Sequence, residues 1–406
     1  MKPYSTWRSA TAYLTLTSMV CMACTFNPQA RANTEANAPA EIQHTVQATH
    51  TTTAGTLKIG KRKIKIALLL DTSNSMDGLI DQAKAQLWKL VNELALAKCG
   101  DERPMLEIAL YEYGNSGLPM NEGYIRQVAM FTDDLDLISE KLFSLTTNGG
   151  DEFCGQVIQS ATTQLDWTGD DNDLRLIFIA GNEPFTQGSV NYAGSCKTAK
   201  QKDIVVNTIY CGSFDEGLSS GWKNGALLTD GSYMSIEQDR KTEYIETPYD
   251  QEIAKLNDKL NDTYVSYGAE GYSKKQNQVT QDANASSYGI SNTTSRVASK
   301  ASAFYSNASW DLVDASREKD FDVAKMKESE LPKEIQGKNK AEKEAFIQQK
   351  SKEREDVRSQ ILALNKKRME YIAEKQKASG DTNSLDAAMI KAIKEQAARK
   401  NFTFQS

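Results

Sequence analysis

Histidine is almost missing from this sequence of 406 residues, which contains only two. His44 and His50 both lie in a stretch rich in Thr and Ala near the N-terminus, where no folded segment is expected. A folded domain of this chain therefore cannot assemble a Ser-His-Asp triad, a Cys-His dyad or a zinc site of the HExxH type. This argues against most hydrolases, although Lys, Tyr or carboxylate bases would remain open to an enzyme.

Long apolar runs and concentrated basic charge are also scarce. No apolar window of about 18 residues occurs beyond the N-terminus, which excludes a protein with several membrane spans. The formal net charge is -6, and a slightly basic region over residues 317–400 follows an acidic body. Since a nucleic-acid binder needs clustered positive charge, this balance argues against that class. A hydrophobic content of 39% and a charged content of 25% are typical of a soluble globular protein.

The N-terminus has the pattern of an export signal. Lys2 and Arg8 precede the apolar stretch AYLTLTSMVCMACTF, and Ala30-Arg31-Ala32 supplies the small-x-small pattern that a signal peptidase recognises. Residues 1–32 are therefore predicted to be a signal peptide, which would make the mature protein periplasmic or secreted. The alternative is a lipoprotein acylated and anchored at Cys24.

Export changes what the cysteines are expected to do. Without the signal peptide an even number remains, in an oxidising compartment where disulfides form. Their wide spacing does not fit a zinc site, which takes paired CxxC motifs. At least one disulfide is therefore expected, and the pairing is open among Cys99, Cys154, Cys196 and Cys211.

The sequence divides into a leader and an α/β domain. Residues 33–60 show no periodicity and hold little that could form a core, which predicts a flexible leader. From 61 to 268, short apolar runs of strand length alternate with amphipathic stretches of helical spacing. This alternation predicts a doubly wound, mostly parallel sheet flanked by helices. The expected strands are 63–71, 106–114, 124–132, 174–185 and 204–212, with 124–132 antiparallel to its predecessor.

Two further regions follow this domain. Residues 269–316 are rich in Ser, Asn, Gln and Ala and are predicted to be a linker or a loosely helical segment. Residues 317–406 are highly charged and carry apolar residues at heptad-like steps on either side of the turn sequence KASGDTNS. This pattern predicts a helical hairpin, or a coiled coil through which the protein self-associates. The seam residues are Val357, Ile361, Leu364, Arg368 and Ile372, and then Leu385, Met389, Ile393 and Ala397.

The motif with the clearest chemistry is DTSNSM at the end of the first strand. Asp71, Ser73 and Ser75 alternate along an expected turn, so that their side chains point the same way. In doubly wound sheets ligands bind beyond the carboxyl ends of the strands. Oxygen ligands without His or Cys suit a hard cation, Mg²⁺ or alternatively Mn²⁺ or Ca²⁺.

With this motif in this place, residues 63–268 resemble the von Willebrand factor A domain (VWA domain), of a bacterial exported type. Its metal-ion-dependent adhesion site (MIDAS) begins with D-x-S-x-S. The resemblance implies two further ligand loops, in which this chain departs from the family pattern. Asp151 stands in the second loop where Thr is usual, and Gly181 replaces the Asp of the third loop. A variant site is therefore expected, with Asp151 as a ligand and Glu183 or Asn182 in place of the missing group.

The resemblance implies binding and not catalysis. We expect an exported VWA-domain protein that binds a partner protein, through a partner carboxylate that completes the coordination of the cation. The chain is thus predicted not to be an enzyme and to bind no nucleic acid. Two alternatives stay open. One is a metal-dependent envelope enzyme with Asp151 or Glu183 as its base, and the other is a structural envelope protein with a degenerate metal site.

Overall fold

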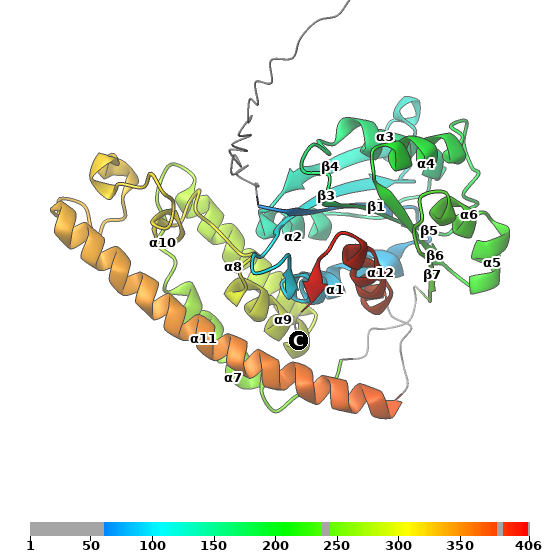
Figure 1. Ribbon diagram of the computed structural model, residues 1–406. Coiled ribbons are helices and arrows are strands. Elements are labelled where there is room, and N and C mark those ends of the chain that lie inside the picture. Colours follow the sequence, from blue (N-terminus) through cyan, green and yellow to red (C-terminus); the bar gives the residue numbers. More distant parts are fainter. Residues whose placement is uncertain (1–60, 238–243, 380–384, 405–406) are drawn as a thin grey trace, which may run out of the picture. The chain divides into compact units, whose positions relative to one another are not determined.

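The computed structural model describes residues 61–237, 244–379 and 385–404 of the chain. The predicted signal peptide, the predicted leader and the lipoprotein alternative at Cys24 all lie outside these ranges. The described residues belong to one compact unit. Figure 1 shows a sheet with helices on both faces, and beside it a layer of further helices. Among the described residues no helix has both the length and the apolar character that a membrane span requires.

The sheet has six strands in the order β4-β3-β1-β5-β6-β7, and only β4 is antiparallel to its neighbour. This arrangement confirms the predicted doubly wound, mostly parallel fold and the antiparallel edge strand. The strands are β1 (Lys63–Asp71), β3 (Met105–Tyr113), β4 (Ile125–Thr132), β5 (Leu174–Gly181), β6 (Val205–Cys211) and β7 (Tyr233–Ile236).

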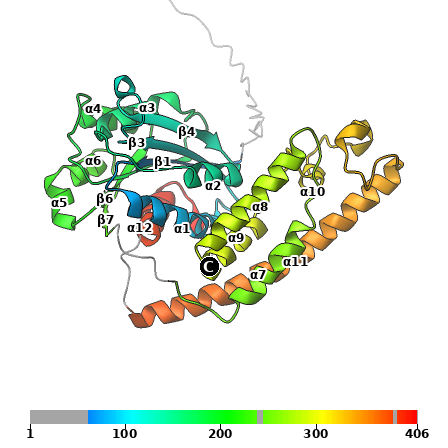
Figure 2. The same cartoon turned by 180° about the vertical axis from the view of Figure 1, so that it is seen from behind.

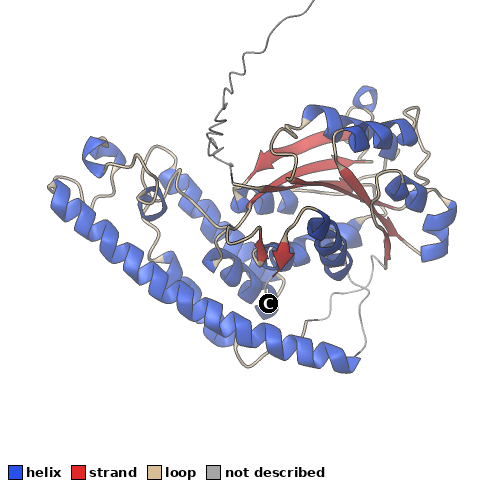
Figure 3. Ribbon diagram, viewed as in Figure 1, coloured by secondary structure: helices blue, strands red, loops and turns tan. Residues whose placement is uncertain are grey.

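The central strand β1 shows why the apolar run of the sequence is continuous. Ile64, Ile66 and Leu68 belong to the core on one face of the sheet, while Ala67 and Leu69 belong to the core on the other. A parallel strand with helices on both sides is buried on both faces, so the strand is apolar without a break from Ile66 to Leu70. Figure 3 shows the two helical layers. One contains α3 (Cys154–Gln164), α4 (Tyr192–Gln201), α5 (Phe214–Ser219) and α6 (Trp222–Leu227), and the other α1 (Asp77–Leu94), α2 (Leu135–Phe143) and α12 (Leu385–Arg399).

Of the two alternatives for 269–316, the linker is wrong and the helical segment is closer, because the segment is helical and packed. Together with residues from 250 onward it forms what we call the helical arm, residues 250–379. Small Ser and Ala side chains let α9 approach its neighbours closely, and it packs on α1, α7 and α8. The arm consists of α7 (Asp250–Asn261), α8 (Gly271–Ser287), α9 (Ile290–Ala301), α10 (Leu312–Ala315) and α11 (Lys340–Ser379), with two 3₁₀ turns at Val323–Lys325 and Glu328–Glu330.

The boundary predicted at residue 268 is also wrong. Helix α7 was expected to complete the α/β domain, but it packs on α9 and α11 of the arm. The sheet domain therefore consists of residues 61–236 with α12, which returns to it after the arm. Figure 2 shows α12 beside α1, away from α11.

The tail is not a hairpin packed on itself. Helix α11 has 40 residues and packs on α7 and α9, whereas α12 packs on α1. The two rows of apolar residues predicted for the tail are both buried, but they pack against different parts of the protein. Ile361 of α11 is buried in the arm, and Ile393 of α12 is buried under the sheet. After α12, strand β8 (Thr403–Phe404) pairs with β2 (Ala97–Lys98). The apolar face of α12 is thus covered by its own chain, which leaves it no part in the predicted coiled coil.

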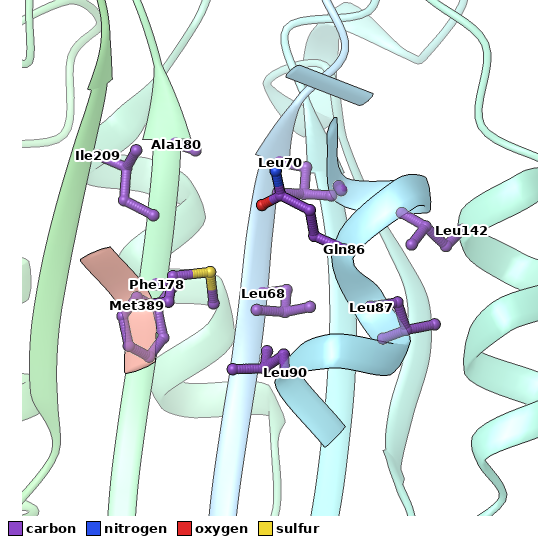
Figure 4. A pocket seen from close by; sticks show the side chains of 11 residues that line it. Leu68, Leu70, Gln86, Leu87, Leu90, Leu142, Phe178, Ala180, Ile209 and Met389 are labelled. Carbon is purple, nitrogen blue, oxygen red and sulfur yellow. The ribbon is translucent and has the colours of Figure 1, made fainter. Parts of the chain in front are cut away.

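Helix α12 closes the face of the sheet that α1 leaves open. Met389 lines an apolar cavity of about 40 Å³ together with Leu87 and Leu90 of α1 and Phe178 of β5 (Figure 4). Ile393 and Ala397 belong to the same core. A helix contributed after the arm is therefore part of the core of the sheet domain.

The predicted disulfide is also wrong, since Cys99, Cys154, Cys196 and Cys211 are all free. Cys154 and Cys196 belong to the core beside α3 and α4, whereas Cys211 belongs to the core on the opposite face of the sheet. Cys99 is half-buried, lies in an isolated bridge with Glu102 and packs against the core on the α1 side of the sheet. Burial raises the pKa of the Cys196 thiol to about 12, and a buried thiol of this kind is unreactive.

A buried arginine joins the arm to the sheet domain. Arg296 of α9 is 1% exposed, and its guanidinium lies 2.7 Å from Asp136 of α2 and 2.9 Å from Asp282 of α8. It stacks over Trp88 of α1 at 4.4 Å and over Tyr305 at 5.1 Å. Burying a charge costs free energy unless it is paired, so this arginine requires both carboxylates.

Asp282 is the shared partner in this cluster. Its carboxylate also lies 2.7 Å from Lys300 and accepts hydrogen bonds from Asn257 and Asn261. Burial alone would raise the pKa of Asp282, but the charges of Lys300 and Arg296 outweigh it and hold the pKa well below its usual range. A carboxylate with a depressed pKa stabilises the folded state above the pKa of the unfolded chain. That contribution is lost as the pH falls toward the pKa of the folded state.

We therefore predict that Asp282→Asn destabilises the protein by about 3–5 kcal/mol, because it leaves two buried cations without their shared partner. Urea unfolding at pH 7 measures this difference. Asp258→Asn on α7, which removes an exposed carboxylate, is the matched control and should have little effect. The difference between wild type and Asp282→Asn should shrink in acid, below about pH 4. Equal stability of the two variants would contradict the role of this cluster.

Candidate functional site

The carboxyl ends of β1, β3 and β5 meet at one edge of the sheet. Asp71 ends β1 opposite Tyr113 of β3, and Gly181 ends β5. The loops that follow these strands, with the loop between α2 and α3, lie around Asp71. Edges of this kind hold the ligand sites of doubly wound sheets.

Asp71 is fully buried. Its Oδ1 accepts a hydrogen bond of 2.7 Å from the backbone N–H of Ser73, while no described residue donates a hydrogen bond to the buried Oδ2. The Oγ atoms of Ser73 and Ser75 are 3.2 Å apart, so the alternate spacing does direct both hydroxyls to the same side. Ser73 is buried and Ser75 is exposed, and thus the group opens to the surface at Ser75.

The second-loop residue beside Asp71 is Glu152, and Asp151 is exposed. The Glu152 side chain is 3% exposed and lies within hydrogen-bonding reach of Asp71. Its backbone N–H donates to Gln187 at 2.7 Å, and its Oε2 accepts from the backbone N–H of Glu183 at 3.3 Å. These two bonds hold Glu152 inward, which leaves its neighbour facing solvent. The structure therefore does not support Asp151 as the inward-facing residue of this loop.

The loop that contains Gly150 and Glu152 is held in place by close packing of its backbone against the loop after β3. A Cβ atom on Gly150 would lie 2.5 Å from the carbonyl oxygen of Gly114 and 2.8 Å from the backbone nitrogen of Ser116. Only glycine allows the loop to pack this tightly against the loop after β3. The sequence does contain Glu152, next to Asp151 after Gly149-Gly150, but the pattern alone does not say which acid turns inward.

In the third loop Asn182 contacts the site through its side chain, and Glu183 contacts it through its backbone. The Asn182 amide donates to Ser75 Oγ at 3.3 Å, and its Oδ1 is buried without a hydrogen bond. The Glu183 carboxylate is exposed, and the residue contributes its backbone N–H to Glu152. The structure thus places Asn182 where the sequence left a choice between the two.

Tyr113 occupies the space beside Gly181. Its hydroxyl donates to the carbonyl oxygen of Ala180 at 2.9 Å and lies 3.9 Å from Cys154 Sγ. A Cβ atom on Gly181 would clash with this hydroxyl. Burial raises the pKa of Tyr113 well above its usual range, so the phenol stays protonated. The buried tyrosine explains why the carboxylate usual in the third loop is absent here.

The electrostatics of the site follow from two adjacent buried carboxylates. Burial raises the pKa of Asp71 well above its usual range, and the neighbouring Glu152 raises it further. A proton on Asp71, or a cation between the two groups, would relieve the repulsion that raises this pKa. The unpaired Oδ2 of Asp71, the second carboxylate and the oxygens of Ser73, Ser75 and Asn182 form a donor set of the kind that hard cations prefer.

The carboxylates alone would not complete a metal site. Over the described ranges, no three or more His, Cys, Asp or Glu side chains gather as a group that could hold an ion. Hydroxyl and amide oxygens, with water, would have to supply the remaining ligands. Such mixed sets are usual for Mg²⁺, which keeps several waters.

Comparison with known proteins identifies likenesses of fold alone. No family model matches the sequence, and no curated protein matches it. Solved structures similar to this chain include the hypothetical protein BatB from Bacteroides thetaiotaomicron (17% identity, 43% of this chain and 90% of that one, TM-score 0.33). Another is a VWA domain described as SpRpn10 (16% identity, 43% and 87%, TM-score 0.32).

A third similar structure is proximal thread matrix protein 1 from the mussel byssus, with a zinc-occupied MIDAS motif (11% identity, 44% of this chain and 43% of that one, TM-score 0.32). The neighbours thus include VWA domains, the family that residues 63–268 resemble. The fold class itself rests on the strand order of this chain.

We predict that Gly181→Asp, which introduces the residue expected here from the VWA pattern, destabilises this protein because the new side chain meets the Tyr113 hydroxyl. Removing that hydroxyl should make room, so Tyr113→Phe combined with Gly181→Asp should be more stable than additivity of the single variants predicts. A double-mutant cycle from thermal or urea unfolding measures this coupling. Strict additivity would show that Tyr113 does not exclude a side chain at position 181.

Proposed function

We propose that the sheet domain holds a divalent cation, Mg²⁺ or Mn²⁺, at this edge and through it binds a carboxylate of a partner protein. The observation that carries the proposal is the pair of buried carboxylates, Asp71 and Glu152, with one Asp71 oxygen unpaired. A cation would offset the repulsion between them and give the unpaired oxygen a ligand. The bound cation would act as a Lewis acid toward an incoming oxygen ligand.

The proposed ligand set is Asp71, Ser73, Ser75 and Glu152, with Asn182 as a neighbour of Ser75. Two carboxylates leave a divalent cation with little or no net charge in the site. An additional anionic ligand, such as a side-chain carboxylate of a partner, would still gain from hard-ion coordination. The exposure of Ser75 leaves a path from the surface for that group.

The chemistry favours binding over catalysis. The described residues contain no histidine, and the tyrosine nearest the carboxylates is buried with a raised pKa. Neither carboxylate is free to act as a base if both hold a cation. In keeping with the export pattern of the N-terminus, we propose that the partner is met in the periplasm or outside the cell.

Metal binding tests the ligand set. We predict saturable binding of Mg²⁺ and Mn²⁺ to the mature protein in calorimetric titrations, with a thermal midpoint that rises as the metal is added. Asp71→Asn and Glu152→Gln should each weaken binding by at least about tenfold, because each removes the negative charge of a direct ligand.

Asp151→Asn is the matched control, since it neutralises the neighbouring exposed carboxylate and should leave affinity unchanged. Glu183→Gln serves the same purpose in the third loop. Wild-type protein without saturable binding up to millimolar metal would overturn the cation site. Equal losses in Asp151→Asn and Glu152→Gln would overturn the assignment of Glu152.

Partner binding is tested separately with envelope extract from the native host. We predict that the immobilised mature protein retains a partner in Mg²⁺, releases it with EDTA and retains none when Asp71→Asn is the bait. Extract whose protein carboxylates have been amidated with carbodiimide and ethanolamine should lose the interaction. A partner retained equally in EDTA, or by Asp71→Asn, would show that binding does not pass through the cation.

A further inference from the structure

A cavity lined by several charged residues lies at the end of the sheet opposite the candidate cation site. It has a volume of about 280 Å³ and is bordered by Leu174 at the start of β5 and Val205 at the start of β6. This cavity is at the amino ends of the parallel strands, whereas the candidate cation site is at their carboxyl ends. A single water needs about 10–15 Å³ of such volume, so the space is large enough for a small molecule.

Four cations and two carboxylates line this cavity. They come from four separate segments of the chain, so the tertiary structure alone brings them together. They are Arg175, Lys200, Arg399 and Lys400, with Asp203 and Asp230.

The two carboxylates hold cations around the opening. Asp203 pairs with Lys400 and lies 3.6 Å from Arg175, and Asp230 lies 3.1 Å from Lys200. Arg399 has a hydrogen bond of 3.2 Å to the carbonyl oxygen of Asp230 and no carboxylate partner among the described residues. The lining therefore carries a surplus of positive charge.

Arg175 is the buried cation of the group, with 7% of its surface exposed. Its Nε donates to the carbonyl of Trp167 at 3.0 Å and its Nη2 to the carbonyl of Asp170 at 2.8 Å. Its Nη1 has an ion pair at 3.6 Å, beyond hydrogen-bonding distance. The guanidinium is thus held rigidly by two backbone carbonyls while one of its nitrogens can still donate toward a ligand.

Residues beside the cavity have a backbone conformation, positive φ, that is uncommon for residues other than glycine. Four non-glycine residues of the described chain have positive φ, and Asp203, Asp230 and Asn401 are three of them, at 57°, 58° and 61°. Each follows the end of a helix, and the next residue donates back to a helix carbonyl, as in Ile204 to Ala199 at 3.0 Å. Glycine is usual at this position, and carboxylates are unfavourable near a helix C-terminus. Two carboxylates placed against both preferences indicate a function for the cations they hold.

From this arrangement we infer that the cavity binds a small anion with two or more negative charges, carried on carboxylate or phosphate oxygens. The ligand would take its hydrogen bonds from Arg175 and Arg399, and Lys200 and Lys400 would add positive charge. The ion pairs at the rim are partly exposed, so an incoming anion can compete with Asp203 and Asp230 for these cations. Because α12 contributes Arg399 and Lys400, the site exists only when α12 is docked on the sheet domain.

Calorimetric titration of the mature protein tests this inference, at low salt and without divalent metal. Citrate and inorganic phosphate are the two probes, and acetate is the monovalent control. We expect saturable binding of at least one probe, weaker binding of acetate and a loss of affinity with added salt. Citrate alone would identify a polycarboxylate site, and phosphate alone a phosphate site.

Two variants should change the affinity in opposite directions. Arg399→Gln should weaken binding of the probe by about tenfold, because it removes a charged donor. Asp230→Asn should strengthen binding several-fold, because it removes the anion that competes for Lys200 and keeps a residue that tolerates positive φ. A variant that has lost its fold cannot bind more tightly than wild type. Opposite effects of Arg399→Gln and Asp230→Asn would therefore distinguish a binding site from a loss of folding.

Arg317→Gln, which removes a half-exposed arginine from the arm, is the matched control and should bind as wild type does. Absence of saturable binding for both probes would overturn the inference. So would an Arg399→Gln variant that binds as tightly as wild type.

Discussion

The arm and the sheet domain are held together around one buried positive charge. Arg296 lies between Trp88 of the sheet domain and Tyr305 of the arm, and it pairs with a carboxylate from each side, Asp136 and Asp282. A desolvated guanidinium is stable only while all of these contacts persist. Because α9 also packs directly on α1, the charge and the apolar core act at the same interface. The arm is therefore part of the folded unit and not a tethered extension.

The requirement that a buried charge be paired also applies to the candidate cation site, where the buried groups are acidic. At Arg296 a buried cation is surrounded by carboxylates, whereas at Asp71 two buried carboxylates lie together without a positive side chain between them. The first arrangement is complete within the protein and serves stability. The second is completed only by a proton or an added cation, which is why it can serve binding.

Helix α12 connects the two ends of the sheet. Its apolar face fills the core beneath β5 through Met389 and Ile393, and its C-terminal end brings Arg399 and Lys400 to the amino ends of β5 and β6. The chain leaves the sheet domain after β7, forms the arm and returns to supply this helix. Folding of the sheet domain and assembly of the anion cavity therefore both depend on a segment that follows the arm in sequence.

The amino-acid sequence alone determines the core of the α/β fold. Buried parallel strands need unbroken apolar runs, so KIKIALLLD could be recognised as a central strand, and with it the place of Asp71, Ser73 and Ser75 at its end. The helix-forming spacing of α1, α11 and α12 was likewise visible, because amphipathic periodicity is a local property of the chain.

Long-range contacts decided what the sequence left open. Whether Asp151 or Glu152 turns inward depends on Gln187 and the Glu183 backbone, and whether Gly181 can carry a side chain depends on Tyr113 of another strand. The Ser-rich segment over 269–316 resembled a linker because its helices α8 and α9 bury mostly small and polar side chains, such as Gln278, Gln281 and Arg296. Local pattern thus established which elements form and where the first ligand loop lies. The partners of those elements, the second acid of the site and the cation cluster of the anion cavity depend on contacts between distant residues, which no local pattern records.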